Sequence, residues 1–180
     1  MFPKKKIRVP KLLDGGQLRE YAYKILTVRS QSVGEMRTKL RSKAETKEDV
    51  EPLIERLKEA GVLNDDKFAE HFAQNRLENE GLGKMRVLRD LRQRKVGGPA
   101  AEKAVASTFS EVDEIALIEQ FLARKFRKVN LPEYLAEPKN LRAAFRRLRY
   151  AGYSSAITIK VLKRYTSRAE EIGESIEDGE

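Results

Sequence analysis

The sequence predicts an all-α protein of three tandem three-helix repeats that form an elongated, curved array. Between residues 15 and 167 nearly every segment places apolar residues three or four positions apart, and none alternates convincingly with period two. Helix start and stop signals sort the expected helices into groups of three. We therefore expect a mobile basic arm over 1–14, repeats over 15–62, 63–109 and 110–167, and a mobile acidic tail over 168–180.

The first repeat has three recognisable helix starts. Gly15-Gly16 precedes the first helix, and Ser32 with Glu35 has the spacing of a capping box that opens the second. Thr46 with Asp49 predicts the start of the third. These helices are expected to end near residues 29, 44 and 61.

The second repeat begins at Asn64 or Asp65, either of which can cap a helix that stops before Gly81. The next helix is expected over 83–95. Gly97-Gly98-Pro99 introduces the last helix of this repeat, because proline suits the first turn of a helix.

The third repeat is expected to start at Ser110, with Asp113 at the capping-box position. Pro132 and Pro138 predict a break after its first helix. The second helix is expected over 139–151, where Gly152 ends it, and the third begins after a Ser154 cap and reaches about residue 166.

The three groups also resemble one another in sequence. Shifting the middle helix of the first group by 51 positions superposes its apolar and basic residues on the second group, and a further 57 reaches the third. The matched sets are Met36, Leu40 and Arg41; Val87, Leu91 and Arg92; and Leu148 with Arg149. Divergent tandem duplication explains this pattern, although any two amphipathic helices share some of it.

Composition excludes several classes of site. The 180 residues include no cysteine, so disulfides, thiolate metal sites and cysteine nucleophiles are ruled out. No apolar run approaches the roughly 20 residues of a membrane span, and we expect a soluble cytoplasmic protein. The net charge is +9 even though the last eleven positions contain six acidic residues, so the net charge of the remaining residues is higher than +9. Such a chain attracts polyanions, unless the charge serves only solubility.

The positive charge is concentrated on the middle helix of each repeat. In the second repeat Met85, Val87, Leu88 and Leu91 are expected to face the core, which places basic residues on the opposite side. Rows of guanidinium groups suit a phosphate backbone. One row on one helix is more simply explained as solvated surface, but here equivalent rows occur on three helices. The residues expected to bind nucleic acid or an acidic partner are Arg37, Arg41, Arg86, Arg89, Arg92, Lys139, Arg142, Arg146 and Arg149.

Other candidate sites are weaker. Asp65-Asp66 at a helix start is more typical of capping than of catalysis, and His71 has no second histidine or nucleophile beside it. Four tyrosines would stack on bases if exposed, but their helical spacing favours the edge of the core: Tyr21, Tyr23, Tyr150 and Tyr153. We expect no enzymatic activity, metal or cofactor.

The stretch 55–76, continued through 81–96, resembles the RecX family of bacterial regulatory proteins. The matching positions are Leu63, Asp65, Phe68, Ala69, Gly83, Val87 and Leu91. Residues 22–40 are also similar to the first repeat of that family. Where the family usually closes the middle helix with Lys-Gly, this chain has Arg94-Lys95 in the second repeat and Lys43-Ala44 in the first, whereas Gly152 keeps the pattern in the third.

The resemblance implies a non-enzymatic regulator of the RecA recombinase in DNA repair, recombination and the SOS response. Members of this family bind in the groove of the RecA–single-stranded DNA filament and suppress its extension, its ATP hydrolysis and strand exchange. The implied partners are the RecA filament, single-stranded DNA and, more weakly, duplex DNA; we expect a monomer and no membrane partner. The alternative is a stand-alone helix-turn-helix-like regulator that binds duplex DNA without RecA.

Overall fold

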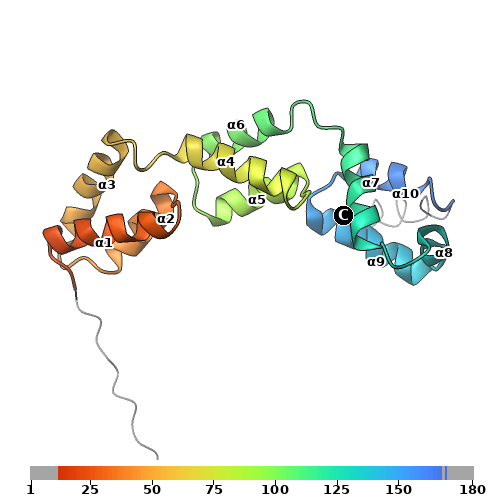
Figure 1. Ribbon diagram of the computed structural model, residues 1–180, viewed down its shortest axis with the longest axis horizontal. Helices are drawn as coiled ribbons and strands as arrows, with labels where there is room; N and C mark the ends of the chain where they lie inside the picture. The colour runs from red at the N-terminus through yellow and green to blue at the C-terminus, as the bar shows by residue number, and fades with distance from the viewer. Residues whose placement is uncertain (1–11, 168, 170–180) are drawn as a thin grey trace, which may run out of the picture. The chain divides into compact units, whose positions relative to one another are not determined.

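The computed structural model describes residues 12–167 and Ala169, and this part of the chain is helical (Figure 1). The elements in chain order are α1 (Gly15–Val28), α2 (Val33–Arg41), a 3-10 turn (Lys47–Asp49), α3 (Val50–Glu59), α4 (Asp65–Glu78), α5 (Lys84–Gln93), α6 (Gly98–Thr108), α7 (Glu114–Lys125), α8 (Leu131–Ala136), α9 (Pro138–Ala151) and α10 (Ser155–Leu162). Its described residues form no strand, only an isolated bridge between Leu13 and Ala44. The all-α prediction is confirmed.

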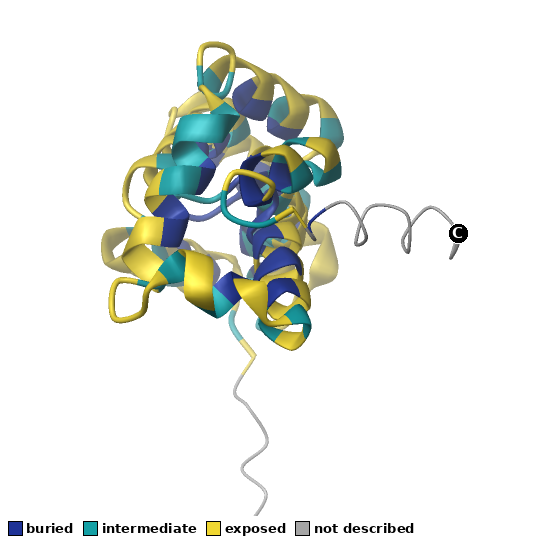
Figure 2. Ribbon diagram, turned by 90° about the vertical axis from the view of Figure 1, so that its right-hand side faces the viewer, coloured by how far each residue is buried: buried dark blue, intermediate teal, exposed yellow. Residues whose placement is uncertain are grey.

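The described residues divide into two compact units. We call residues 12–68 with 94–97 the N-terminal unit, and residues 69–93 with those from 98 onward the C-terminal unit. Each unit contains a core to which the predicted apolar faces contribute, and Figure 2 shows the buried residues recurring along one side of the helices. The expected acidic tail and most of the expected arm lie outside the described residues.

Two of the three helix starts in the N-terminal unit differ from expectation. The capping box is confirmed: Ser32 Oγ accepts from Glu35 N at 3.0 Å, and Ser32 N donates to the Glu35 carboxylate at 3.3 Å. However, α1 begins at Gly15 itself, because Asp14 accepts the Gln17 amide. Thr46 makes no side-chain cap, and the chain enters α3 through the 3-10 turn instead.

Leu13, within the segment expected to be an arm, is held by the turn that follows α2. Its amide donates to Lys43 O at 2.8 Å, and its carbonyl accepts from Glu45 N at 2.9 Å. These bonds flank Ala44, which is 6% exposed and keeps a negative φ. The first repeat therefore closes its middle helix without a left-handed glycine.

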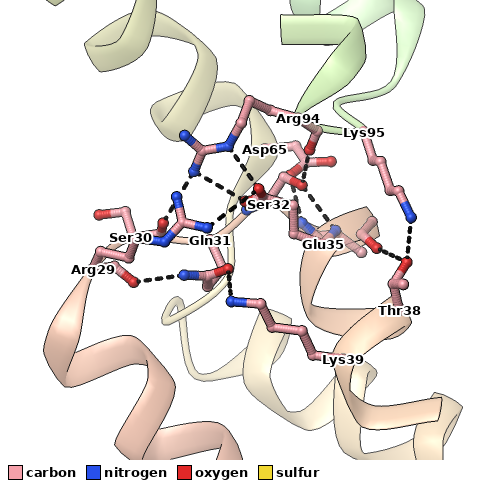
Figure 3. A network of polar contacts seen from close by, with 12 residues as sticks. Arg29, Ser30, Gln31, Ser32, Glu35, Thr38, Lys39, Asp65, Arg94 and Lys95 are labelled. Atoms are coloured by element: carbon pink, nitrogen blue, oxygen red, sulfur yellow. Dashed lines mark hydrogen bonds and ion pairs between the residues drawn. The ribbon is translucent and has the colours of Figure 1, made fainter. Parts of the chain in front are cut away.

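The segment after α5 also lacks a glycine, but its backbone conformation differs from that of the segment after α2 (Figure 3). Lys95 takes the left-handed conformation, with φ of 59°, at the position where the resemblance to the RecX family predicts glycine. That conformation costs a non-glycine residue about 1–2 kcal/mol. Neighbouring contacts offset it: Lys95 Nζ donates to Thr38 Oγ1 at 2.7 Å, and Arg94 binds the Glu35 carboxylate at 2.7 and 3.0 Å.

The start of α2 is bonded to residues from further along the chain. Ser32 Oγ donates to Arg94 O, and Val33 N donates to Asp65 Oδ1 at 2.8 Å (Figure 3). Asn64 rather than Asp65 caps α4, since its side chain accepts from Lys67 N. The two residues that we expected to be interchangeable therefore have separate structural roles.

The C-terminal unit corrects two further expectations. Asp113 is itself the N-cap of α7 and accepts from the Ile115 and Ala116 amides, so it is not the third residue of a Ser110 box. The expected break after α7 is present, because the next helix begins only at Leu131, but Pro132 and Pro138 lie inside the first turns of α8 and α9. Proline is tolerated there because the first amides of a helix have no intrahelical acceptor. The helix α8 was not expected, because Pro132 was interpreted as part of the break.

The turn between α9 and α10 packs against the start of α5. Gly152 ends α9 in the left-handed region, at φ of 95°, and Ser154 caps α10, both as expected. Gly83 N donates to Ala151 O at 2.8 Å, and Met85 N donates to Gly152 O at 3.1 Å. These bonds join α5 to the end of α9.

Tyr153 fills the centre of this contact. The side chain is fully buried, its ring lies edge-on to Phe121 at 5.6 Å, and its hydroxyl donates to Gly81 O. Burial raises the pKa of this hydroxyl, which therefore stays protonated as a donor at any physiological pH.

Candidate nucleic-acid interface

Two basic residues of α2, Arg37 and Arg41, share one acid within the N-terminal unit. Arg37 Nε and Arg41 Nη2 both lie against the Glu51 carboxylate, at 2.9 and 2.8 Å. Desolvation raises the pKa of Glu51, but the hydrogen bonds and charges of the two arginines outweigh it and lower the pKa. Both guanidinium groups are therefore already engaged, although one carboxylate balances only one of their two charges.

Two arginines of α5 bind the end of α9. Arg86 Nη1 and Arg89 Nη2 donate to Tyr150 O at 3.3 and 3.1 Å. The last carbonyls of a helix lack intrahelical donors and carry the negative end of its dipole, so cations are favoured there. Both residues were expected to contact a partner, and the structure shows that they also stabilise this helix end.

Arg86 has a second structural role, because it also binds a buried acid. Its Nε donates at 2.8 Å to Asp90 Oδ1, and the Asp90 side chain is only 7% exposed. The other Asp90 oxygen lies 3.6 Å from Arg76 Nε. Arg92, on the exposed side of α5, lies 3.4 Å from Glu102 in a pair open to water, which is worth at most about 1 kcal/mol.

The basic residues of α9 divide into two groups. Arg149 Nη1 donates to the carbonyl of Tyr153, so it holds the turn. Lys139, Arg142 and Arg146 are exposed, and within the described part of the chain no acid or hydrogen-bond acceptor engages their side chains. The opposite face of α9 is buried as predicted, by Leu141, Ala144, Phe145 and Leu148.

The orientation of α9 is consequently fixed, and the three free cations point to solvent. Arginine keeps its charge at all working pH values and presents a planar fork of donors that matches phosphate oxygens. We call Lys139, Arg142 and Arg146 the α9 basic face. It is the part of the predicted site that the structure leaves available for a partner.

Two large side chains of the C-terminal unit, Tyr150 of α9 and Met85 of α5, are exposed although neither was expected to be. Tyr150 is 68% exposed and follows Arg146 by four residues, which is the spacing of neighbours on one helix face. Met85 is 61% exposed, which corrects the expectation that it faces the core. The buried side of α5 is instead formed by Val87, Asp90 and Leu91. The four-residue spacing between Arg146 and Tyr150 was the sequence signal that could have placed Tyr150 on the exposed face of the helix.

The weaker candidate sites, Asp65-Asp66 and His71, form no catalytic or metal-binding cluster in the described residues. No group of three metal-ligating side chains lies together there, and none of its helices is both long and apolar enough to cross a membrane. Burial raises the pKa of Asp65, whose carboxylate accepts from the Val33 amide, and His71 is exposed.

Comparison with known proteins agrees with the resemblance in the sequence. The family model described as "RecX, second three-helix domain" matches residues 64–105. The regulatory protein RecX of Pseudomonas entomophila is 30% identical over 145 residues, which are 81% of this chain and 89% of that protein. The RecX of Pelodictyon phaeoclathratiforme is also 30% identical, over 58% of this chain and 63% of that protein.

A solved structure shares the fold. The crystal structure of RecX from Lactobacillus salivarius superposes with a TM-score of 0.63 over 84% of this chain and 96% of that one, at 17% identity. The helical architecture is therefore that of a solved RecX structure. Together with the Pseudomonas relative, which is matched over most of its length, these findings show that the chain belongs to the RecX family of regulatory proteins.

Proposed function

We propose that this protein binds the RecA–single-stranded DNA filament and inhibits its extension, ATP hydrolysis and strand exchange. The observation that carries the proposal is the α9 basic face, three adjacent exposed cations without an acid to neutralise them. Membership of the RecX family supports the recombinase as the partner, and the α9 basic face offers cations that can contact the DNA of the filament.

The packing of α9 supports this use of the face. The charged side chains cannot turn inward, because Phe145 and Leu148 occupy the core on the opposite side of the helix. No rearrangement is then needed before phosphates bind, and each phosphate contact releases counterions condensed on the DNA. Affinity from this source falls steeply with salt and is insensitive to sequence.

The test is a titration of RecA-dependent ATP hydrolysis on single-stranded DNA. The unchanged protein should inhibit at amounts well below one per RecA. A triple variant with Lys139→Glu, Arg142→Glu and Arg146→Glu should inhibit at least tenfold more weakly. Arg149 is left unchanged because it holds the turn after α9.

A matched control separates position from total charge. Lys24, Lys47 and Lys67 of the N-terminal unit are exposed, and their side chains have no partner in the described residues. Reversing these three to glutamate changes net charge by the same amount and should leave inhibition near that of the unchanged protein. Absence of inhibition by the unchanged protein at equimolar RecA, or equal effects of the two triple variants, would reject the proposal.

The alternative of a stand-alone duplex-binding regulator has less support in the structure. Helices α9 and α10 are joined by a short turn with Gly152, as in helix-turn-helix motifs, but such motifs read DNA with their second helix. Lys160 is the basic residue of α10, whereas the free cations belong to α9. Sequence-dependent duplex binding that persists at physiological salt without RecA would favour the alternative.

A further inference from the structure

The α9 basic face continues into an exposed aromatic ring. Tyr150 follows Arg142 and Arg146 at intervals of four residues, so the three side chains occupy one side of the helix about 6 Å apart along its axis. At 68%, the Tyr150 side chain is more exposed than that of Tyr23, at 45%. In the described residues its ring makes no aromatic or cation contact. The fold therefore exposes this large apolar group without using it for packing.

The backbone that carries this ring is held firmly. Tyr150 O accepts from the guanidinium groups of Arg86 and Arg89, and the following residues are fixed by the left-handed Gly152 and the buried Tyr153. A tyrosine has only two side-chain torsions, so little entropy is lost when its ring binds a flat partner. An exposed ring on a fixed backbone is a preformed stacking platform.

The surroundings of the ring select the kind of partner. Arg146 lies one turn before it, and Met85, also exposed, is linked through its amide to Gly152 O. Cations beside an aromatic ring suit a nucleotide, whose phosphate binds the cation while its base stacks on the ring. Duplex DNA keeps its bases stacked on one another, whereas single-stranded DNA offers free base faces.

We propose that Tyr150 stacks on a nucleobase of single-stranded DNA whose phosphates lie along Arg142 and Arg146. The inference rests on the proposed function in that it uses the same face of α9. It adds a reason for this protein to prefer single strands over duplex, which charge alone does not provide.

The inference is tested with free oligo-dT and without RecA, by fluorescence anisotropy of a labelled strand. Tyr150→Ala should weaken binding about 5- to 150-fold, the range for loss of one stacked base, while Tyr150→Phe should stay within about twofold of the unchanged protein. Tyr23→Ala, which removes an exposed tyrosine of the N-terminal unit, is the matched control and should have no effect. Because the Tyr150 side chain is exposed, its removal should leave the circular dichroism and melting temperature unchanged.

A strand of the same length without bases distinguishes stacking from charge. The unchanged protein and Tyr150→Ala should bind this abasic strand equally well. Equal binding of oligo-dT by both proteins, an equal loss on the abasic strand, or no binding of oligo-dT by the unchanged protein would overturn the inference. If the unchanged protein nevertheless inhibits RecA, the proposed function stands while the stacking role fails. If Tyr150→Ala weakens binding of oligo-dT but the unchanged protein does not inhibit RecA, the stacking role stands while the proposed function fails.

Discussion

Replacing Gly83 by alanine should separate α5 from the end of α9. A Cβ at this position would lie 2.5 Å from the backbone C and O of Gly152 and 2.7 Å from Tyr153 N. These are backbone atoms of a turn that Tyr153 fixes in the core, so they cannot give way as a flexible side chain would. The two segments must therefore move apart.

The cost follows from the bonds at this contact. Separation breaks the backbone hydrogen bonds from Gly83 N to Ala151 O and from Met85 N to Gly152 O, each worth about 1 kcal/mol. Overpacking adds about 1–3 kcal/mol, and the reduced entropy of the unfolded chain returns about 0.4–1 kcal/mol. We expect Gly83→Ala to lower the free energy of unfolding by about 2–5 kcal/mol.

The assay is urea unfolding followed by far-ultraviolet circular dichroism. Gly97→Ala is the matched control, because a Cβ there meets nothing within 4 Å and φ is not positive, and it should change stability by less than about 1 kcal/mol. A Gly83→Ala protein that unfolds at the same urea concentration as the unchanged one would refute the reasoning, and so would an equal loss in Gly97→Ala.

Two further predictions concern the arginine contacts. Arg86→Ala should destabilise the protein by about 1–3 kcal/mol, because it removes the nearer cation from the buried Asp90 carboxylate, while Arg92→Ala, which loses only an exposed pair, should cost less than about 1 kcal/mol; equal urea midpoints for the two variants would contradict this. The lowered pKa of Glu51 means that its contribution to stability is present above the unfolded pKa and is lost as pH falls through the folded pKa, so Glu51→Gln should flatten the decline of the melting temperature below about pH 5. An unchanged pH profile would show that the pairs with Arg37 and Arg41 contribute nothing.

Much of the fold is predictable because it depends on local signals. The capping box of Ser32, the left-handed Gly152 and the apolar spacing of α9 all act within a few residues of one another. The errors also have local causes: Pro132 was interpreted as a breaker although it is compatible with a first turn, and Ser110 was given a capping role that Asp113 performs. Lys95 could not have been predicted, because its left-handed conformation depends on bonds between Arg94, Lys95 and the start of α2.

The candidate site is predictable in part for the same reason. Amphipathic periodicity places Lys139, Arg142 and Arg146 on the exposed side of α9, and the structure agrees. Periodicity does not show that Arg86 and Arg89 bind Tyr150 O, since the partner is more than 60 residues away in the sequence. Counting charge on a helix therefore overestimates the number of residues free to bind a partner.

The salt dependence of binding to RecA–single-stranded DNA filaments tests most directly whether the α9 basic face contacts DNA phosphates. Replacing Lys139, Arg142 and Arg146 by glutamine should reduce the slope of log affinity against log salt by about 2, since each phosphate contact on a single strand contributes about 0.7. Glutamine at Lys24, Lys47 and Lys67 should leave the slope unchanged. The same slope for the α9 variant and the unchanged protein would contradict the account.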